Sequence, residues 1–93
     1  MSKIEIEDDG KKGRFAIYED TKFAGEMTFT WVGSSGIIID HTGVEDQFRG
    51  KGVGEKMVLE SVDFARKRDI KIIPLCPFAK SVFEKEEGIS DVL

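Results

Sequence analysis

This sequence has a single cysteine, no excess of cationic side chains and no long apolar stretch. Its one cysteine, Cys76, excludes an internal disulfide and favours a reducing, cytoplasmic setting. Asp and Glu total 18 against 14 Lys and Arg, a net charge of −4, so we expect neither a nucleic-acid nor an anionic-membrane binder. No apolar run is long enough to span a bilayer, and residues 1–10 carry no apolar signal core. The composition predicts a soluble protein whose acidic balance suits a cationic partner such as an amine.

The first half of the chain predicts antiparallel strands. Apolar and polar residues alternate over residues 3–7, 14–18 and 23–32, and turn-forming residues separate these runs. Residues 37–44 begin with three isoleucines, which is typical of a central strand covered on both faces. Gly43, near the end of this run, predicts a β-bulge.

The second half predicts helix, strand and helix. Apolar residues follow helical spacing from residue 53, with Leu59 and Phe64 widening the apolar stripe. Residues 70–75 read as a strand parallel to residues 37–44, and Pro77 suits the start of a last helix. The expected fold is therefore α+β: a mixed, mainly antiparallel five-stranded sheet with a central helix after the fourth strand and a C-terminal helix. With 93 residues, we expect one domain, residues 1–93.

The segment between the fourth strand and the central helix carries a possible phosphate site. It reads Gln-Phe-Arg-Gly-Lys-Gly-Val-Gly-Glu over residues 47–55, with glycine at alternate positions. Glycines let the backbone curl so that its N–H groups approach a ligand, and the helix start adds unpaired N–H groups and partial positive charge. Arg49 and Lys51 are available as counter-charges. The segment therefore indicates an anionic, phosphorylated ligand.

Two familiar phosphate motifs do not match this segment. A P-loop starting at Gly50 would need a second Gly and a Ser or Thr where Glu55 and Met57 stand. A dinucleotide fingerprint needs its third Gly at one of these same two positions. Both readings are excluded, and a simple helix-capping turn remains the alternative to a ligand site.

Residues 47–52 resemble at every specified position the Gln/Arg-x-x-Gly-x-Gly/Ala signature of the GNAT superfamily of N-acetyltransferases. The resemblance implies the GNAT-like fold and acetyl-coenzyme A as cofactor, its pyrophosphate held by loop N–H groups and its pantetheine arm by the splayed end of the fourth strand. The cofactor-binding residues implied in this way are Val44, Gln47, Phe48, Arg49, Gly50, Lys51, Gly52, Val53, Gly54 and Glu55.

The sequence departs from this family in two respects. It has no room for the two helices that usually follow the first strand and help to form the acceptor pocket. Phe83 also stands where many members place a Tyr that protonates the departing thiolate. The one tyrosine, Tyr18, is expected to be a half-buried strand residue. Another acid is needed, or the protein does no catalysis.

Cys76 and His41 are the predicted catalytic residues. Each can transfer a proton or attack a thioester near neutral pH, and the crossover is expected to place them at neighbouring strand ends. Small GNAT-like proteins are similar here, with a Cys before the last helix.

Cys76 is expected at the helix cap, where the dipole lowers the thiol pKa. In a covalent route Cys76 is the nucleophile and His41 the base; in a direct route His41 or Glu45 is the base. A small buried thiol and a strand-end histidine are the structural alternatives.

Three functions follow from these observations. The first is an acetyl-coenzyme A-dependent N-acetyltransferase acting on a small amine or a lysine side chain. The second is a non-catalytic coenzyme A binding or sensing module, and the third is a small interaction domain. No metal, nucleic acid or membrane is expected as a partner, and the oligomeric state stays open, with a monomer as the simplest case.

Overall fold

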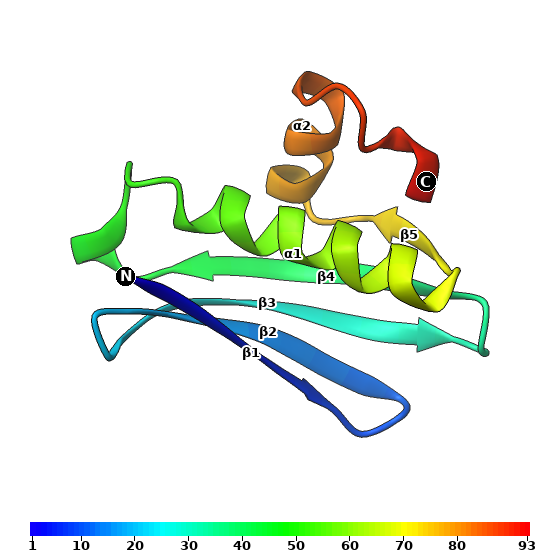
Figure 1. Cartoon of the computed structure of the whole chain (residues 1–93), viewed down its shortest axis with the longest axis horizontal. Coiled ribbons are helices and arrows are strands. Elements are labelled where there is room, and N and C mark those ends of the chain that lie inside the picture. The colour runs from blue at the N-terminus through cyan, green and yellow to red at the C-terminus, as the bar shows by residue number, and fades with distance from the viewer.

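The protein is built on a five-stranded sheet whose strands lie in chain order, β1-β2-β3-β4-β5 (Figure 1). The computed structural model describes residues 1–93. The strands β1 to β4 pair antiparallel with their neighbours, whereas β4 and β5 pair parallel. The strand bounds are β1 Ser2–Asp8, β2 Lys12–Glu19, β3 Lys22–Val32, β4 Gly36–Val44 and β5 Lys71–Pro74.

Two α-helices and two short 3-10 helices complete the chain. The helix α1, Val53–Arg68, connects β4 to β5, and α2, Pro77–Lys85, follows β5. The 3-10 helices are η1, Asp46–Phe48, and η2, Ser90–Val92. This arrangement confirms the predicted α+β fold, with a helix after the fourth strand and another near the C-terminus. None of the helices combines the length and the apolar character needed to cross a bilayer.

A tight turn joins β1 directly to β2. One carboxylate oxygen of Asp9 accepts hydrogen bonds from the backbone N–H groups of Lys11 and Lys12, at 2.8 and 2.7 Å. Gly10 lies in the left-handed region, with φ of 89°. The two helices that usually follow the first strand in the GNAT superfamily are therefore absent, as expected.

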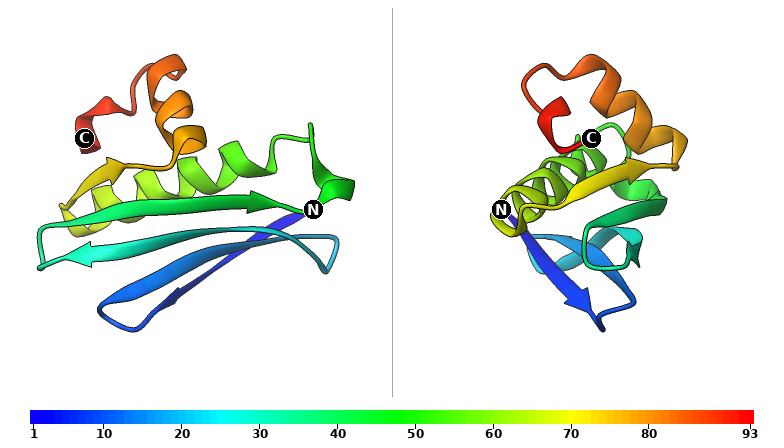
Figure 2. Two further views of the ribbon diagram at one scale, coloured as in Figure 1. Left: turned by 180° about the vertical axis from the view of Figure 1, so that it is seen from behind. Right: turned by 90° about the vertical axis from the view of Figure 1, so that its right-hand side faces the viewer.

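The core lies between the sheet and α1, which runs along the sheet in the left view of Figure 2. Phe64 of α1 packs against Phe15 and Phe29, with ring centroids 5.4 and 5.7 Å apart. These aromatic side chains belong to a cluster of 21 buried residues that also includes residues of β5 and α2. The prediction that Leu59 widens the apolar stripe is wrong, because its side chain is 44% exposed.

A β-bulge interrupts the pairing of β3 with β4, but it lies at Asp40 and not at Gly43 as predicted. Phe29 pairs with Ile39 and Thr28 with His41, so Asp40 has no partner on β3. The Thr30 hydroxyl donates a 2.8 Å hydrogen bond to the Asp40 carboxylate. The extra residue reverses the inward and outward alternation of side chains along the rest of β4.

Candidate active site

A gap opens between β4 and β5 where their pairing ends. The two strands share four residue pairs, the last of which is Ile39 with Pro74. The backbone N–H of Cys76 then donates a 3.1 Å bond to the Ile39 carbonyl. Beyond this point the chain turns into α2, whereas β4 continues to Val44. Residues 40–44 therefore have no neighbouring strand on the β5 side.

The glycine loop at one end of this gap presents unpaired backbone N–H groups. Gly50 and Gly52 have φ of 76° and 77°, a conformation that other residues rarely adopt. The first helical hydrogen bond of α1 runs from the Lys56 N–H to the Gly52 carbonyl, at 3.1 Å. The N–H groups of residues 50–55 donate to no other part of the chain. Such a row of free donors at a helix start suits a phosphate or pyrophosphate.

Gly54 is glycine for a different reason. It lies in the first turn of α1, and a Cβ atom there would come within 2.7 Å of the Phe78 ring. The absence of a side chain lets α2 approach the start of α1 closely. The N–H group of Gly54 is unpaired, and the absence of a side chain at this position serves helix packing.

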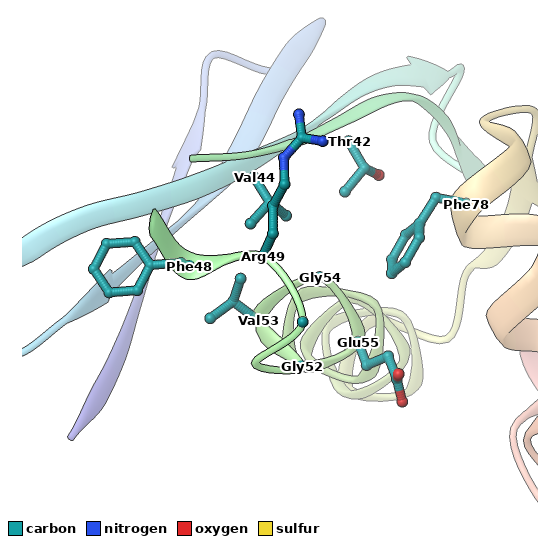
Figure 3. A pocket seen from close by; sticks show the side chains of 10 residues that line it. Thr42, Val44, Phe48, Arg49, Gly52, Val53, Gly54, Glu55 and Phe78 are labelled. Carbon is teal, nitrogen blue, oxygen red and sulfur yellow. The ribbon is translucent and has the colours of Figure 1, made fainter. Parts of the chain in front are cut away.

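A pocket of about 360 Å³ lies between the glycine loop, β4 and α2. In Figure 3, Thr42 and Val44 of β4 face the first turn of α1, with Phe78 beside them. Eight of the ten predicted cofactor-binding residues line the pocket. Gln47 and Lys51 do not. Its lining consists of Thr42, Val44, Phe48, Arg49, Gly50, Gly52, Val53, Gly54, Glu55 and Phe78.

Exposed ion pairs surround the mouth of the pocket. Arg49 Nε lies 3.0 Å from Asp46 Oδ1, and both side chains are largely exposed. Lys85, at the end of α2, pairs with Glu55 at 3.2 Å. Lys51 lies outside the lining, with its ammonium 5.8 Å from the Phe48 ring centroid. Because exposed pairs contribute little stability, Arg49 can exchange Asp46 for an anionic ligand at small cost.

Cys76 occupies the N-cap of α2, and Pro77 is the first helical residue, both as predicted. The side chain is 6% exposed, and its sulfur lies 3.4 Å from the Thr42 hydroxyl oxygen. Burial raises the pKa of the thiol, but the Thr42 hydroxyl and the backbone groups at the start of α2 favour the thiolate, and the net pKa falls below its ordinary value.

His41 does not share this side of the sheet. It pairs with Thr28, whereas Thr42 pairs with the fully buried Met27 on the face covered by α1. The His41 ring nitrogen Nε2 lies beside Gly43, 3.4 Å from where a Cβ of that glycine would be. The structure therefore brings Cys76 to Thr42, with His41 on the opposite face. The bulge at Asp40 causes this difference from the expected Cys76 and His41 pair.

The remaining acid and base candidates lie away from the pocket. Glu45 is exposed and is not part of the lining. Phe83 is 6% exposed within the core. Tyr18 is half-buried and packs edge-on against Phe23, with centroids 5.8 Å apart, as expected of a strand residue. Of the catalytic residues predicted from the sequence, Cys76 is therefore the one that lies beside the pocket wall.

Sequence reasoning missed two lining residues, Thr42 and Phe78. The reversed alternation after the bulge turns Thr42 inward, and no sequence signal marked that bulge at Asp40. From the sequence, Phe78 was placed only within the predicted last helix. Its spacing of two residues from Cys76 could have placed it at the gap.

Known proteins resemble this chain over most of its length. The profile of the GCN5-related N-acetyl-transferase family matches residues 14–92. Protein NATD1 of Xenopus tropicalis is 28% identical over 93 residues, which cover 99% of this chain and 84% of that protein. The NMR structure of a GCN5-like protein from Staphylococcus aureus is 39% identical, with a TM-score of 0.68 over 99% of this chain and 89% of that chain.

A more distant structure shares the fold alone. A GNAT family acetyltransferase from Elizabethkingia anophelis, solved with acetyl-CoA bound, has a TM-score of 0.68 at 10% identity. The match covers 78% of this chain and 63% of that enzyme, so this chain spans less than two thirds of the other's length.

Proposed function

The chain belongs to the GCN5-related N-acetyltransferase family, and on that premise we propose that it uses acetyl-coenzyme A to acetylate a small amine or a lysine side chain. The observation that carries the proposal is the row of free N–H groups over residues 50–55 at the mouth of a pocket whose wall includes Thr42, the hydrogen-bond partner of Cys76. The acetyl-CoA complex of the Elizabethkingia anophelis enzyme supports the choice of cofactor.

The loop and the pocket would hold two parts of such a cofactor, its pyrophosphate and its pantetheine arm. Gly50 and Gly52 leave open space above the loop, since a Cβ at either position would meet nothing within 4 Å. The loop N–H groups would hold the pyrophosphate, with Arg49 as a counter-charge. The free edge of β4 at Val44 would pair with the pantetheine amides, and Phe48 and Phe78 would cover the arm. When bound, acetyl-coenzyme A supplies a thioester as the acetyl donor.

Cys76 and His41 take separate roles in this proposal. Cys76, near the pocket wall, is the nucleophile of a covalent route, in which its thiolate would take the acetyl group and the coenzyme A thiolate would leave. The lowered thiol pKa raises the fraction of reactive thiolate. His41, on the open face of the sheet, is the base for the acceptor ammonium, which must lose a proton before it attacks. In a direct route Cys76 protonates the departing thiolate, and His41 or Glu45 acts on the amine.

Binding of acetyl-coenzyme A tests the loop assignment. Gly52→Asp places a side chain and a negative charge where the pyrophosphate would lie, and we expect calorimetry to show at least a tenfold loss of affinity, about 1.4 kcal/mol or more. Gly33→Asp is the matched control, because Gly33 has φ of 57° and the same open surroundings at the other end of the sheet. Unchanged affinity in Gly52→Asp would remove the loop from the cofactor site.

Intact mass after incubation with acetyl-coenzyme A separates the two routes. A covalent route predicts an acetyl adduct of about 42 Da that is absent in Cys76→Ser, and a slower discharge to amine in His41→Ala. Turnover without an adduct, lost in His41→Ala, would indicate the direct route. Full turnover in both variants would exclude these residues from the mechanism.

A sensing module is the second candidate, and Phe83 is the observation that favours it. This side chain is buried in the core, at the position where the resemblance to the GNAT superfamily implies a proton-donating tyrosine. Sensor and enzyme share the cofactor and differ in turnover. Tight acetyl-coenzyme A binding without coenzyme A release, over a panel of amines and basic peptides, would favour the sensor. Absence of binding would leave only the interaction domain.

A further inference from the structure

Thr42 is the side chain that connects Cys76 to the pocket. The bulge at Asp40 turns Thr42 to the inner face of the sheet, opposite Met27, and the end of β5 leaves room beside it. Cys76 enters this room from the start of α2, held by its backbone bond to Ile39. The sulfur and the Thr42 hydroxyl oxygen then lie 3.4 Å apart, a normal distance for a hydrogen bond to sulfur.

The hydroxyl of Thr42 can serve both protonation states of Cys76. A hydroxyl both donates and accepts hydrogen bonds. The Thr42 oxygen accepts a hydrogen bond from the thiol S–H, and the hydroxyl can rotate to donate one to the thiolate. Among the groups that lower the thiol pKa, the Thr42 hydroxyl has the largest effect, ahead of backbone groups. His41, which directly precedes Thr42 and can carry a charge, points to the opposite face of the sheet.

We propose that Thr42 is a positioning residue that orients the Cys76 sulfur at the pocket wall and donates a hydrogen bond to its thiolate. The inference deepens the proposed function and rests on it only for the use made of the thiolate. The bond itself belongs to the protein without cofactor. Its consequence for Cys76 can therefore be measured in the absence of acetyl-coenzyme A.

The pH dependence of cysteine alkylation tests the proposal. Cys76 is the only thiol in the chain, so the rate of reaction with iodoacetamide reports on this residue alone. Thr42→Val keeps the shape and removes the hydroxyl, and we expect the midpoint of the rate profile to rise by about one pH unit, an approximately tenfold slower reaction below the midpoint. Thr42→Ser restores a hydroxyl and should return the midpoint towards that of the wild type.

Two further variants keep the test decisive. Thr28→Val makes the same substitution on the opposite face of the sheet, across from His41, and should leave the profile unchanged. Thr42→Ala removes the hydroxyl without a second γ-methyl to pack, and should behave as Thr42→Val does even if the valine variant folds poorly. An unchanged midpoint in Thr42→Ala, or an equal rise in Thr42→Ser, would overturn the role of the hydroxyl.

The result is independent of the proposed function. If acetyl-coenzyme A does not bind to the wild-type protein while Thr42→Val still shifts the alkylation profile, the positioning role holds and the function fails. If the cofactor binds and is turned over but the profile does not shift, only the role of Thr42 is wrong.

Discussion

Phe78 and Gly54 meet at the point where α2 passes the start of α1. The contact depends on the missing side chain of Gly54, because an added Cβ would lie 2.7 Å from the ring. The added Cβ would meet atoms at the far end of the Phe78 ring. Phe78 is 39% exposed, so its ring can move outward. This single position therefore affects the pocket wall more than the stability of the fold.

Gly54→Ala should change the free energy of unfolding by less than about 1 kcal/mol, because the better helix propensity of alanine, about 1 kcal/mol, offsets the displacement of Phe78. Acetyl-coenzyme A affinity should fall about tenfold, since the displaced ring no longer covers the pocket. Urea denaturation and calorimetry measure the two effects.

The matched control for this prediction is the Phe78→Ala background. If displacement of the ring is the cause, Gly54→Ala should weaken binding no further once the ring has been removed. The same loss in both backgrounds would contradict the mechanism.

At the scale of elements, α1 has one face buried against the sheet and another exposed to solvent. Met57 is fully buried against the sheet, whereas Leu59, two residues later, is 44% exposed. Met57→Ala should cost about 2 to 5 kcal/mol of unfolding free energy, because it leaves a cavity in the core. Leu59→Ala should cost less than about 0.5 kcal/mol. Urea denaturation of both variants checks this, and a large loss at Leu59 would contradict the observed orientation of the helix.

Elements in which apolar residues or glycines recur at regular spacing were predictable from the sequence. The alternation through Met27, Phe29 and Trp31 predicted β3, and the glycines predicted the loop before α1, because local chemistry determines both. The orientation of Leu59 was not predictable in this way, since the sequence alone does not define how wide a face the sheet covers.

The site was predictable only where backbone conformation determines it. Gly50 and Gly52 were identified because their left-handed conformation needs glycine. The partner of Cys76 was not, because one unpaired residue at Asp40 exchanges the directions of His41 and Thr42. A bulge at an aspartate has no local signature, and strand pairing with β3 decides its place.

At the scale of the whole molecule, carboxylates attach both ends of the chain to its body. Hydrogen bonding to Arg66 on α1 lowers the pKa of Asp91 near the C-terminus. Hydrogen bonding to Ser2 lowers the pKa of Glu19, which also pairs with Lys56 of α1. Both carboxylates are more acidic in the folded than in the unfolded protein.

This arrangement predicts acid sensitivity. A carboxyl group with a lowered folded pKa stabilises the protein fully above its unfolded pKa, near 4, and the stabilisation is lost as the pH falls towards the folded value. We expect the Tm to decrease as the pH is lowered from about 5 to about 3, and to decrease less steeply in Asp91→Asn. Glu84→Gln, at an exposed residue without an ion pair, is the control and should follow the wild type. A slope unaffected by Asp91→Asn would contradict the assignment.

The bulge at Asp40 has a further consequence, which concerns neighbouring molecules. Residues 40–44 of β4 form a bare strand edge, and unpaired edges are templates on which another chain can add a strand and aggregate. A short edge that begins at a bulge is a poor template, because the bulge increases the local twist of the strand and so hinders a regular ladder of hydrogen bonds with another chain. Asp40, whose bulge turns Thr42 inward, therefore also makes it harder for another copy of the protein to add a strand at this edge. Deleting Asp40 would straighten that edge, and self-association is the expected result.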